Sequence, residues 1–261
     1  MSGHIMKNLL FLHGWATDAT VWERQLSAFS GEYHCRTLTL PGYGNGPTWT
    51  EPTLAPAVDA LLRFLEENTR EENGADEKVV ALGWSLGGEV ILKAAHIVPE
   101  YFSGMVLVGA TPCFVTRDDF PWGQSRGVTR RMAKDLEQDL SSTLNGFYAL
   151  NFTEEELKSE EAETFIDYYS SRSAAFHRES ILSSLAALIT TDIREEVQTI
   201  EVPALIIHGD SDQVVPPGAG SFLAEKVPRA HFERFRETGH IPFLTKAERF
   251  NTVVRSFIEE L

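Results

Sequence analysis

The stretch Val79-Val80-Ala81-Leu82-Gly83-Trp84-Ser85-Leu86-Gly87-Gly88-Glu89-Val90 decides the fold of this chain. Its first four residues form a continuous apolar run, which is typical of a buried strand. The next five residues fit the pattern G-x-S-x-G, with Ser85 at the centre. Apolar residues then recur at helical spacing until Pro99, which ends the pattern. The sequence therefore predicts a serine presented on a tight turn between a strand and a helix.

The glycines around Ser85 have a mechanical reason. The turn imposes strained dihedral angles on the serine, and side chains at Gly83 and Gly87 would collide with the neighbouring strand and helix. The turn lifts Oγ of Ser85 out of the sheet and points the N-terminus of the helix at a bound carbonyl group. An ordinary serine in a glycine-rich turn is the alternative interpretation. The strand before and the helix after favour the nucleophile elbow of a serine hydrolase.

Length and composition restrict the class of protein. The 261 residues make one large domain or two small ones, and a hydrophobic content of 43% is ample for a buried core. The formal net charge of −15 argues against nucleic acid and against an anionic membrane surface as partners. No apolar run approaches the roughly 18 residues of a membrane span.

The cysteines and the first residues indicate the cellular compartment in which the protein is expected. Cys35 and Cys113 lie far apart, which fits neither a disulfide framework nor the spacing of a metal site. Residues 1–5 lack the basic and apolar regions of a secretion signal. These features predict a cytoplasmic protein.

Strand-like and helical patterns alternate through most of the chain. The expected strands are residues 9–12, 34–40, 79–82, 104–109, 203–208 and 230–235. The expected helices are residues 18–29, 53–69, 86–98, 221–227 and 247–261, and residues 70–77 form a polar loop. Strands that alternate with helices predict an α/β fold with a doubly wound, mainly parallel sheet.

The alternation is interrupted once. From residue 112 to residue 191 strand-like runs disappear, and helical periodicity with many charges predicts about four short helices. The sequence therefore predicts two parts. Residues 1–111 and 192–261 form the core, and residues 112–191 form a helical insertion.

A serine nucleophile needs a base and an acid that orients the base. In this fold they follow the serine in the order Asp, then His. His240 follows the last expected strand and is the candidate base, which would take the proton of Ser85 and return it to the leaving group. Asp210 and Asp212 compete for the role of the acid. We favour Asp212 because it lies further into the loop, which leaves Asp210 as a turn-forming residue.

The tetrahedral intermediate of acyl transfer needs two backbone donors for its oxyanion. One donor is expected from Leu86, the residue after the nucleophile. The other is expected from the loop after the first strand, and Trp15 is the candidate there. The indole of Trp15 could equally well serve core packing, and His13 is interpreted as structural.

These motifs together resemble a known superfamily. They are His13-Gly14-Trp15, the elbow around Ser85, Asp212-x-x-Val215-Pro216 and Gly239-His240-x-Pro242-Phe243. The chain resembles the α/β-hydrolases and, within them, the pimeloyl-[acyl-carrier protein] methyl ester esterases of biotin synthesis. Pro112-Cys113-Phe114 and Phe147-Tyr148-Ala149-Leu150 support the narrower resemblance.

The resemblance implies a serine carboxylesterase that acts on a methyl ester through an acyl-enzyme. It implies a helical lid made by the insertion, a monomer, and no cofactor or metal. It also implies that an acyl channel is lined by Phe147, Tyr148, Ala149, Leu150 and Asn151, and that an acyl carrier protein presents the substrate.

The chain departs from the family at the carrier protein's docking site. The family holds its acidic carrier protein with arginines on the lid, whereas Ser142 and Gly146 stand where basic residues are expected. The second half of the insertion is acidic. A replacement basic patch, or an ordinary solvated face, is formed by Arg117, Arg126, Arg130, Arg131 and Lys134.

Three other functions remain open from the sequence. A general short-chain carboxylesterase would use the same residues without a carrier protein. A C–C bond hydrolase or lyase would use the same triad, but its pocket typically needs cationic groups that the sequence does not place. A hydrolase-like scaffold that only binds a ligand is the non-catalytic alternative.

Overall fold

One parallel sheet organises the molecule. The computed structural model describes residues 6–44, 46–69 and 78–261. Six parallel strands run in the order β2-β1-β3-β4-β5-β6. They are β1 (Asn8–Leu12), β2 (His34–Leu38), β3 (Val79–Trp84), β4 (Phe102–Val108), β5 (Ala204–Gly209) and β6 (Ala230–Phe235). The predicted doubly wound parallel sheet is confirmed, while the predicted polar loop at 70–77 lies outside the described residues.

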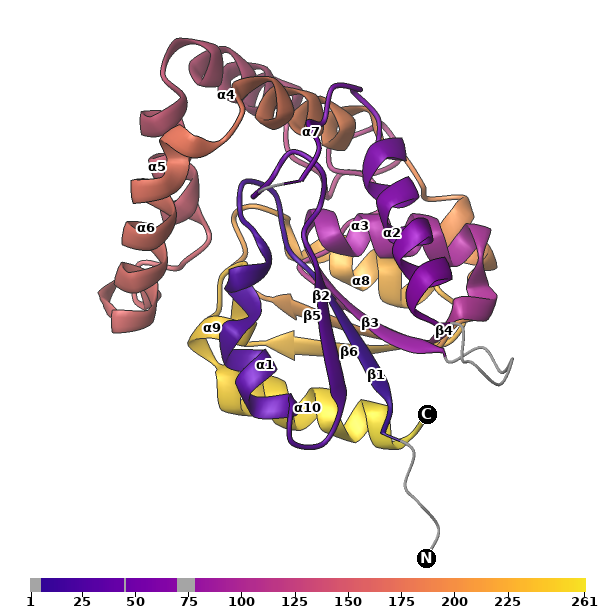
Figure 1. Ribbon diagram of the computed structural model, residues 1–261. Coiled ribbons are helices and arrows are strands. Elements are labelled where there is room, and N and C mark those ends of the chain that lie inside the picture. The colour runs from indigo at the N-terminus through magenta and orange to yellow at the C-terminus, as the bar shows by residue number, and fades with distance from the viewer. Residues whose placement is uncertain (1–5, 45, 70–77) are drawn as a thin grey trace, which may run out of the picture.

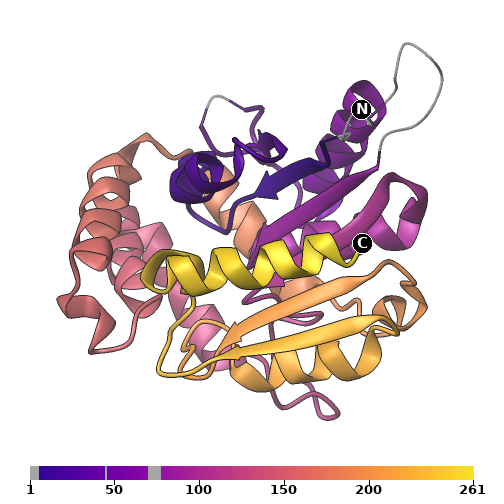
Figure 2. The ribbon, with the colours of Figure 1, turned by 90° about the horizontal axis from the view of Figure 1, so that it is seen from below.

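Helices cover both faces of the sheet (Figures 1 and 2). On one face, α1 (Glu23–Phe29) lies against α10 (Ala247–Glu259). The other face carries α2 (Ala55–Asn68), α3 (Leu86–Ile97) and α8 (Pro217–Lys226). Shorter helices are η1 (Ala19–Trp22), η2 (Pro99–Tyr101), η5 (Glu196–Thr199) and α9 (Pro242–Thr245).

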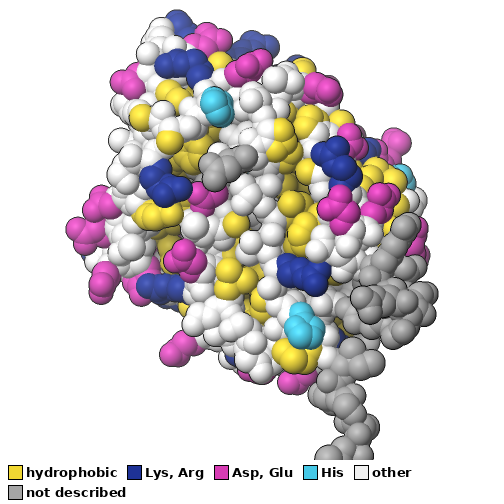
Figure 3. All heavy atoms as spheres, viewed as in Figure 1, with side chains coloured by type: hydrophobic (Ala, Val, Ile, Leu, Met, Phe, Trp, Pro, Cys, Tyr) yellow, Lys and Arg dark blue, Asp and Glu magenta, His cyan; other side chains and the backbone are white. Residues whose placement is uncertain are grey.

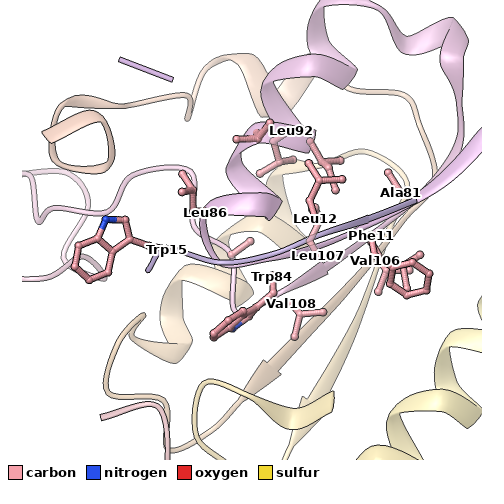
Figure 4. Close-up of a cluster of buried hydrophobic side chains, with 14 of the residues drawn as sticks. Phe11, Leu12, Trp15, Ala81, Trp84, Leu86, Leu92, Val106, Leu107 and Val108 are labelled. Atoms are coloured by element: carbon pink, nitrogen blue, oxygen red, sulfur yellow. The ribbon is translucent and has the colours of Figure 1, made fainter. Parts of the chain in front are cut away.

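The core follows from the two-sided burial of the central strands. Every residue of β3 is buried, as a strand covered on both faces requires. Figure 4 shows Leu12 and Leu107 on the side of α3 and Phe11 and Val106 on the opposite side. The edge strands β2 and β6 are only partly buried. The elbow serine thus follows the most deeply buried part of the sheet.

The insertion between β4 and β5 contains four α-helices, where the sequence predicted four. They are α4 (Arg126–Gln138), α5 (Leu140–Leu150), α6 (Glu160–Arg172) and α7 (Arg178–Thr190), with η3 (Glu156–Lys158) and η4 (Ser173–Ala175) between them. The arrowheads of β5 and β6 point toward the side on which α5 and α6 lie (Figure 1). The two ends of the insertion meet, because Ile193 N–H donates to the carbonyl of Pro112 at 2.9 Å.

Two helical boundaries differ from the sequence patterns. The helix α8 begins at Pro217, before the expected Ser221, because proline is well suited to the first helical position. The short helix α9, directly after His240 and Ile241, was not predicted. Within the described part of the chain, no helix combines the length and the apolar character needed to cross a membrane.

Candidate active site

Ser85 occupies a strained turn between β3 and α3. Its φ is +53° and its ψ is −117°, a conformation that a non-glycine residue adopts only at a cost. A Cβ at Gly83 would lie 2.6 Å from the carbonyl carbon of Gly87, and a Cβ at Gly87 would lie 2.6 Å from the carbonyl oxygen of Leu12. Glycine is therefore required on both sides of Ser85, as the G-x-S-x-G pattern indicated.

The imidazole of His240 is fixed on several sides. Its Nδ1 lies 2.6 Å from Oδ2 of Asp212. Its backbone N–H donates to the carbonyl of Asn151 at 2.8 Å, and its carbonyl accepts from the indole of Trp84 at 3.0 Å. The ring also packs on Gly109 at the end of β4, where a Cβ would lie only 2.8 Å from two ring atoms. These contacts together fix the position of the His240 imidazole ring.

These same contacts connect His240 to residues that adjoin Ser85. Trp84, which holds the histidine carbonyl, directly precedes the serine. Val108, whose carbonyl accepts the N–H of Ser85 at 2.8 Å, directly precedes Gly109. Nε2 of His240 is buried and has no hydrogen-bond partner among the described residues. The nitrogen that a general base needs is thus free at the end of the sheet where the serine is presented.

The hydrogen bonds and charges around Asp212 keep its carboxyl group ionised. Oδ1 accepts the N–H groups of Val214 and Val215, both at 2.8 Å, and Oδ2 faces His240 and His208. Burial alone would raise the pKa of this carboxyl group. The charge of His240 and hydrogen bonds from both histidines outweigh burial and hold the pKa well below its usual range. The carboxylate can therefore orient His240 and stabilise its protonated form.

The competing carboxylate has a different position. Asp210 is exposed, and its Oδ1 accepts the N–H of Glu237 at 2.7 Å. Glu237 has a φ of +53°, so this bond supports a tight turn. The structure thus brings Asp212 to His240 and leaves Asp210 in the turn.

His208 is a member of this cluster that sequence reasoning missed. It is the penultimate residue of β5 and is fully buried. Its Nε2 lies 3.2 Å from Oδ2 of Asp212 and 2.9 Å from the carbonyl oxygen of Val215. Because both neighbours are acceptors, Nε2 carries a proton. The sequence signal was its position four residues before Asp212, but a histidine at a strand end has no chemistry that distinguishes it from a packed one.

Two backbone amides are available near the elbow. Leu86 is the first residue of α3, so its N–H precedes the first hydrogen bond within that helix. Trp15 lies on the loop after β1, followed by Ala16 with a φ of +57°. The positive φ marks a loop that its surroundings hold in an uncommon conformation. These are the two segments in which the sequence predicted the oxyanion donors.

The insertion holds the loop after β1. The indole of Trp15 donates to Oγ of Ser184 at 3.1 Å and packs edge-on against Phe147, with 4.8 Å between ring centroids. The hydroxyl of Tyr148 donates to the carbonyl of Ala16 at 2.9 Å. The indole of Trp15 therefore packs against the insertion, while its backbone remains the candidate donor.

The residues expected to line an acyl channel divide between two faces of α5. Phe147, Tyr148 and Asn151 are buried toward the core, and Phe147 meets Trp15. Ala149 is half-buried and Leu150 is 49% exposed, so the structure does not bring these two to the buried face. Helical periodicity separates the two sets, because adjacent residues on a helix point about 100° apart.

Fold and site together define a class of protein. A serine at a strained turn after a central parallel strand, with an aspartate and a histidine on later loops, is the arrangement of the α/β-hydrolases. The sequence profile of the alpha/beta hydrolase fold family matches residues 7–247, and the chain belongs to this family.

Named relatives narrow the comparison and confirm the resemblance seen in the motifs. The chain is 32% identical to the pimeloyl-[acyl-carrier protein] methyl ester esterase of Nitrosomonas europaea over 254 residues, which cover 93% of this chain and 92% of the relative. The protein of the same name from Aromatoleum aromaticum is 31% identical over 249 residues, covering 92% and 94%. An esterase from Exiguobacterium antarcticum has a similar structure, with a TM-score of 0.87 at 26% identity over 97% of this chain and 92% of that one.

Proposed function

We propose that this protein is a serine carboxylesterase. The observation that carries the proposal is Nε2 of His240, which is buried and unpartnered among the described residues while Nδ1 is bound to Asp212. Ser85, on its strained turn, follows β3, and Trp84 just before it donates its indole N–H to the carbonyl of His240 at 3.0 Å. A free imidazole nitrogen and a serine on an elbow turn, both at the carboxyl ends of the parallel strands, are the groups that nucleophilic acyl transfer requires.

The reaction then proceeds in two halves. Oγ of Ser85 attacks the ester carbonyl while Nε2 of His240 takes its proton, and the N–H groups of Trp15 and Leu86 hold the oxyanion. The imidazolium returns the proton to the departing alcohol, which leaves an acyl group on Ser85. A water molecule activated by His240 then attacks this acyl-enzyme and releases the acid.

The names of the relatives supply the proposed substrate. Both are pimeloyl-[acyl-carrier protein] methyl ester esterases, so we assign this chain a methyl ester of a carrier-bound pimeloyl group, in biotin synthesis. The core would consist of residues 1–111 and 192–261, with residues 112–191 as the lid. Phe147, on the buried face of α5, would contact the acyl chain.

A hollow on the insertion suits an acidic carrier protein. Its volume is about 420 Å³, and Arg117, Arg126 and Arg130 line it together with apolar residues and threonines. Among the described residues, Arg126 and Arg130 form no ion pair, whereas Arg117 lies 4.0 Å from Asp192. Figure 3 shows charged side chains of both signs scattered over one face of the molecule. The whole chain has a net charge of −15, so unpaired arginines around a hollow form an uncommon positive site that would attract an acidic partner.

The buried groups favour an ester over a C–C bond substrate. Among the described residues, no lysine or arginine is buried. A C–C hydrolase or lyase typically uses such a cation to hold a substrate carboxylate within the pocket. A general short-chain carboxylesterase would use the same triad. Its preference for plain short esters would distinguish it from an esterase that acts on a carrier-bound substrate.

The test compares pimeloyl-[acyl-carrier protein] methyl ester with p-nitrophenyl butyrate. We expect a much higher kcat/KM for the carrier-bound ester, and loss of both activities in Ser85→Ala. The double variant Arg126→Glu/Arg130→Glu should raise KM for the carrier-bound ester about tenfold and leave the plain ester unchanged. Arg131→Glu is the matched control, because Arg131 pairs with Asp135 and does not line the hollow. Equal use of both esters would contradict the assignment to biotin synthesis.

A further inference from the structure

The insertion holds the histidine loop through two consecutive backbone amides. The N–H of Gly239 donates to Oε2 of Glu156 at 2.8 Å, and the N–H of His240 donates to the carbonyl of Asn151 at 2.8 Å. Asn151 directly follows α5, and Glu156 is the first residue of η3. The catalytic base proposed above is therefore attached by its own backbone to the part of the chain proposed as the lid.

Glu156 makes three hydrogen bonds through one buried carboxyl group. Oε2 also accepts the N–H of Thr153 at 2.9 Å, and Oε1 accepts the hydroxyl of Thr245 on α9 at 2.6 Å. The side chain is 7% exposed and forms no ion pair within the described residues. The carboxyl group thus joins three segments of the chain: its own turn, the residue before His240, and the helix after it.

The contact is close enough to be specific for glycine. A Cβ at Gly239 would lie 2.4 Å from the carbonyl oxygen of Asn151 and 3.1 Å from Oε2 of Glu156. The histidine loop could not move toward the insertion, and a movement away would break the hydrogen bonds that the N–H groups of Gly239 and His240 donate. The position of His240 is therefore set from both sides, by Trp84 on the core and by Asn151 and Glu156 on the insertion.

A purely local role accounts for only one of the bonds. Thr153 and Glu156 form a capping box, in which the Glu156 N–H donates to the threonine hydroxyl at 3.1 Å and the carboxylate accepts the threonine N–H. This pair would stabilise η3 without any contact to the histidine loop. The bonds from Gly239 and Thr245 are additional, and they point toward the base.

We propose that Glu156 is a positioning residue for His240, which couples the docked insertion to the geometry of the base. This inference rests on the proposed esterase function. Without the carboxyl group, the N–H of Gly239 loses its acceptor, and the loop gains freedom at the residue next to the base. Small displacements of a base reduce the rate of proton transfer while substrate contacts remain.

The test is steady-state kinetics of Glu156→Ala on p-nitrophenyl butyrate, with Glu156→Gln as the conservative variant. We expect kcat to fall about 10- to 100-fold in the alanine variant while KM stays within about twofold. The glutamine should retain most of kcat, because its amide oxygen can accept from Gly239 while its NH₂ group donates to the hydroxyl of Thr245. The far-downfield proton signal of His240 Nδ1–H should broaden only in the alanine variant.

Controls separate this proposal from stability and from the proposed function. Glu155→Ala is the matched control, because Glu155 is exposed and paired with Lys158, and its kcat should equal that of the wild type. If Glu156→Ala does not fold, Glu156→Asp keeps the carboxylate and shortens its reach, and its kcat should still fall severalfold. Unchanged kcat, or a rise in KM alone, would overturn the role of Glu156 while Ser85→Ala remained inactive. Activity in Ser85→Ala would instead overturn the proposed function.

Discussion

Oδ2 of Asp212 lies 2.6 Å from Nδ1 of His240, and both side chains are buried. The other carboxylate oxygen is occupied by two backbone amides, so the group cannot rotate away from the imidazole. Because the carboxylate is an acceptor, it fixes the proton on Nδ1 and leaves Nε2 of His240 as the basic nitrogen.

Asp212→Asn tests this tautomer directly. The amide oxygen would keep the bonds to Val214 and Val215, which places the NH₂ group against Nδ1 and moves the ring proton to Nε2. We expect kcat to fall about 10³- to 10⁴-fold with little change in KM, measured with a chromogenic ester. Asp210→Asn is the matched control, because Asp210 serves the turn at Glu237. Comparable losses in both variants would argue that the acid has been misassigned.

Tyr148→Phe tests the support of the oxyanion loop. The variant removes the hydroxyl group that donates to Ala16 at 2.9 Å. We expect a loss of about 1 kcal/mol in the free energy of unfolding and a severalfold lower kcat, because the amide of the adjacent Trp15 loses its fixed direction. Tyr168→Phe, at an exposed tyrosine of α6, should change neither quantity. A stability loss without any change in kcat would separate Tyr148 from the oxyanion loop.

Glu89→Gln tests a buried carboxyl group in the first turn of α3. Burial raises the pKa of Glu89 well above its usual value, and Oε2 has no hydrogen-bond partner among the described residues. The folded state therefore holds this proton more tightly than the unfolded chain. The contribution of Glu89 to the free energy of unfolding is fully present below about pH 4.3, the pKa in the unfolded chain. It is lost as the pH rises toward the raised pKa of the folded state.

Urea denaturation at pH 5 and pH 8 should show the glutamine variant gaining stability relative to the wild type as the pH rises. Each unit of raised pKa corresponds to about 1.4 kcal/mol. Glu100→Gln, at an exposed glutamate of η2, should show no such gain. A constant difference between Glu89→Gln and wild type at both pH values would contradict a neutral Glu89.

Buried His13 should make the free energy of unfolding depend on pH in the direction opposite to Glu89. Nδ1 lies 2.8 Å from the carbonyl of Gly14, and Nε2 accepts the N–H of Leu40 at 3.0 Å, so the neutral ring uses both nitrogens. Burial lowers the pKa of His13 to about 4. Unfolded chains take up this proton from about pH 6.5 downward, so stability is lost between pH 6.5 and pH 4, by about 3 kcal/mol in total.

Chemical denaturation at pH 7 and pH 5 measures this loss. His13→Gln should be less stable at pH 7 but should lose less stability on acidification than the wild type. His34→Gln, at an exposed histidine of β2, should follow the wild type at both pH values. An equal loss in His13→Gln and wild type would mean that His13 is not the group responsible.

The sheet and the elbow could be predicted from sequence because their signals are local. Buried parallel strands give continuous apolar runs, and the turn at Ser85 requires glycines at fixed positions. Ser85, Asp212 and His240 lie at the same edge of the sheet because loops after parallel strands meet there. The position in the loop favoured Asp212 over Asp210, and the coordinates place Asp212 against His240 and Asp210 in the turn at Glu237.

The contacts between the insertion and the core could not be predicted. Glu156 stands in an acidic run of three glutamates, and nothing in that run distinguishes it from Glu154 and Glu155. Its bond to Gly239 spans 83 residues and depends on how the insertion docks. Similarly, Phe147 and Leu150 looked alike as apolar residues, and only the docked orientation of α5 separates the buried one from the exposed one.

If Ser85 is a nucleophile activated by His240, a reagent that modifies activated serines will label it. The intact protein is treated with a fluorophosphonate, and the modified peptide is identified by mass spectrometry. We expect a single adduct on Ser85, absent in Ser85→Ala and formed at least about 100-fold more slowly in His240→Ala. An adduct on another residue, or an undiminished labelling rate in His240→Ala, would contradict the activation of Ser85 by His240.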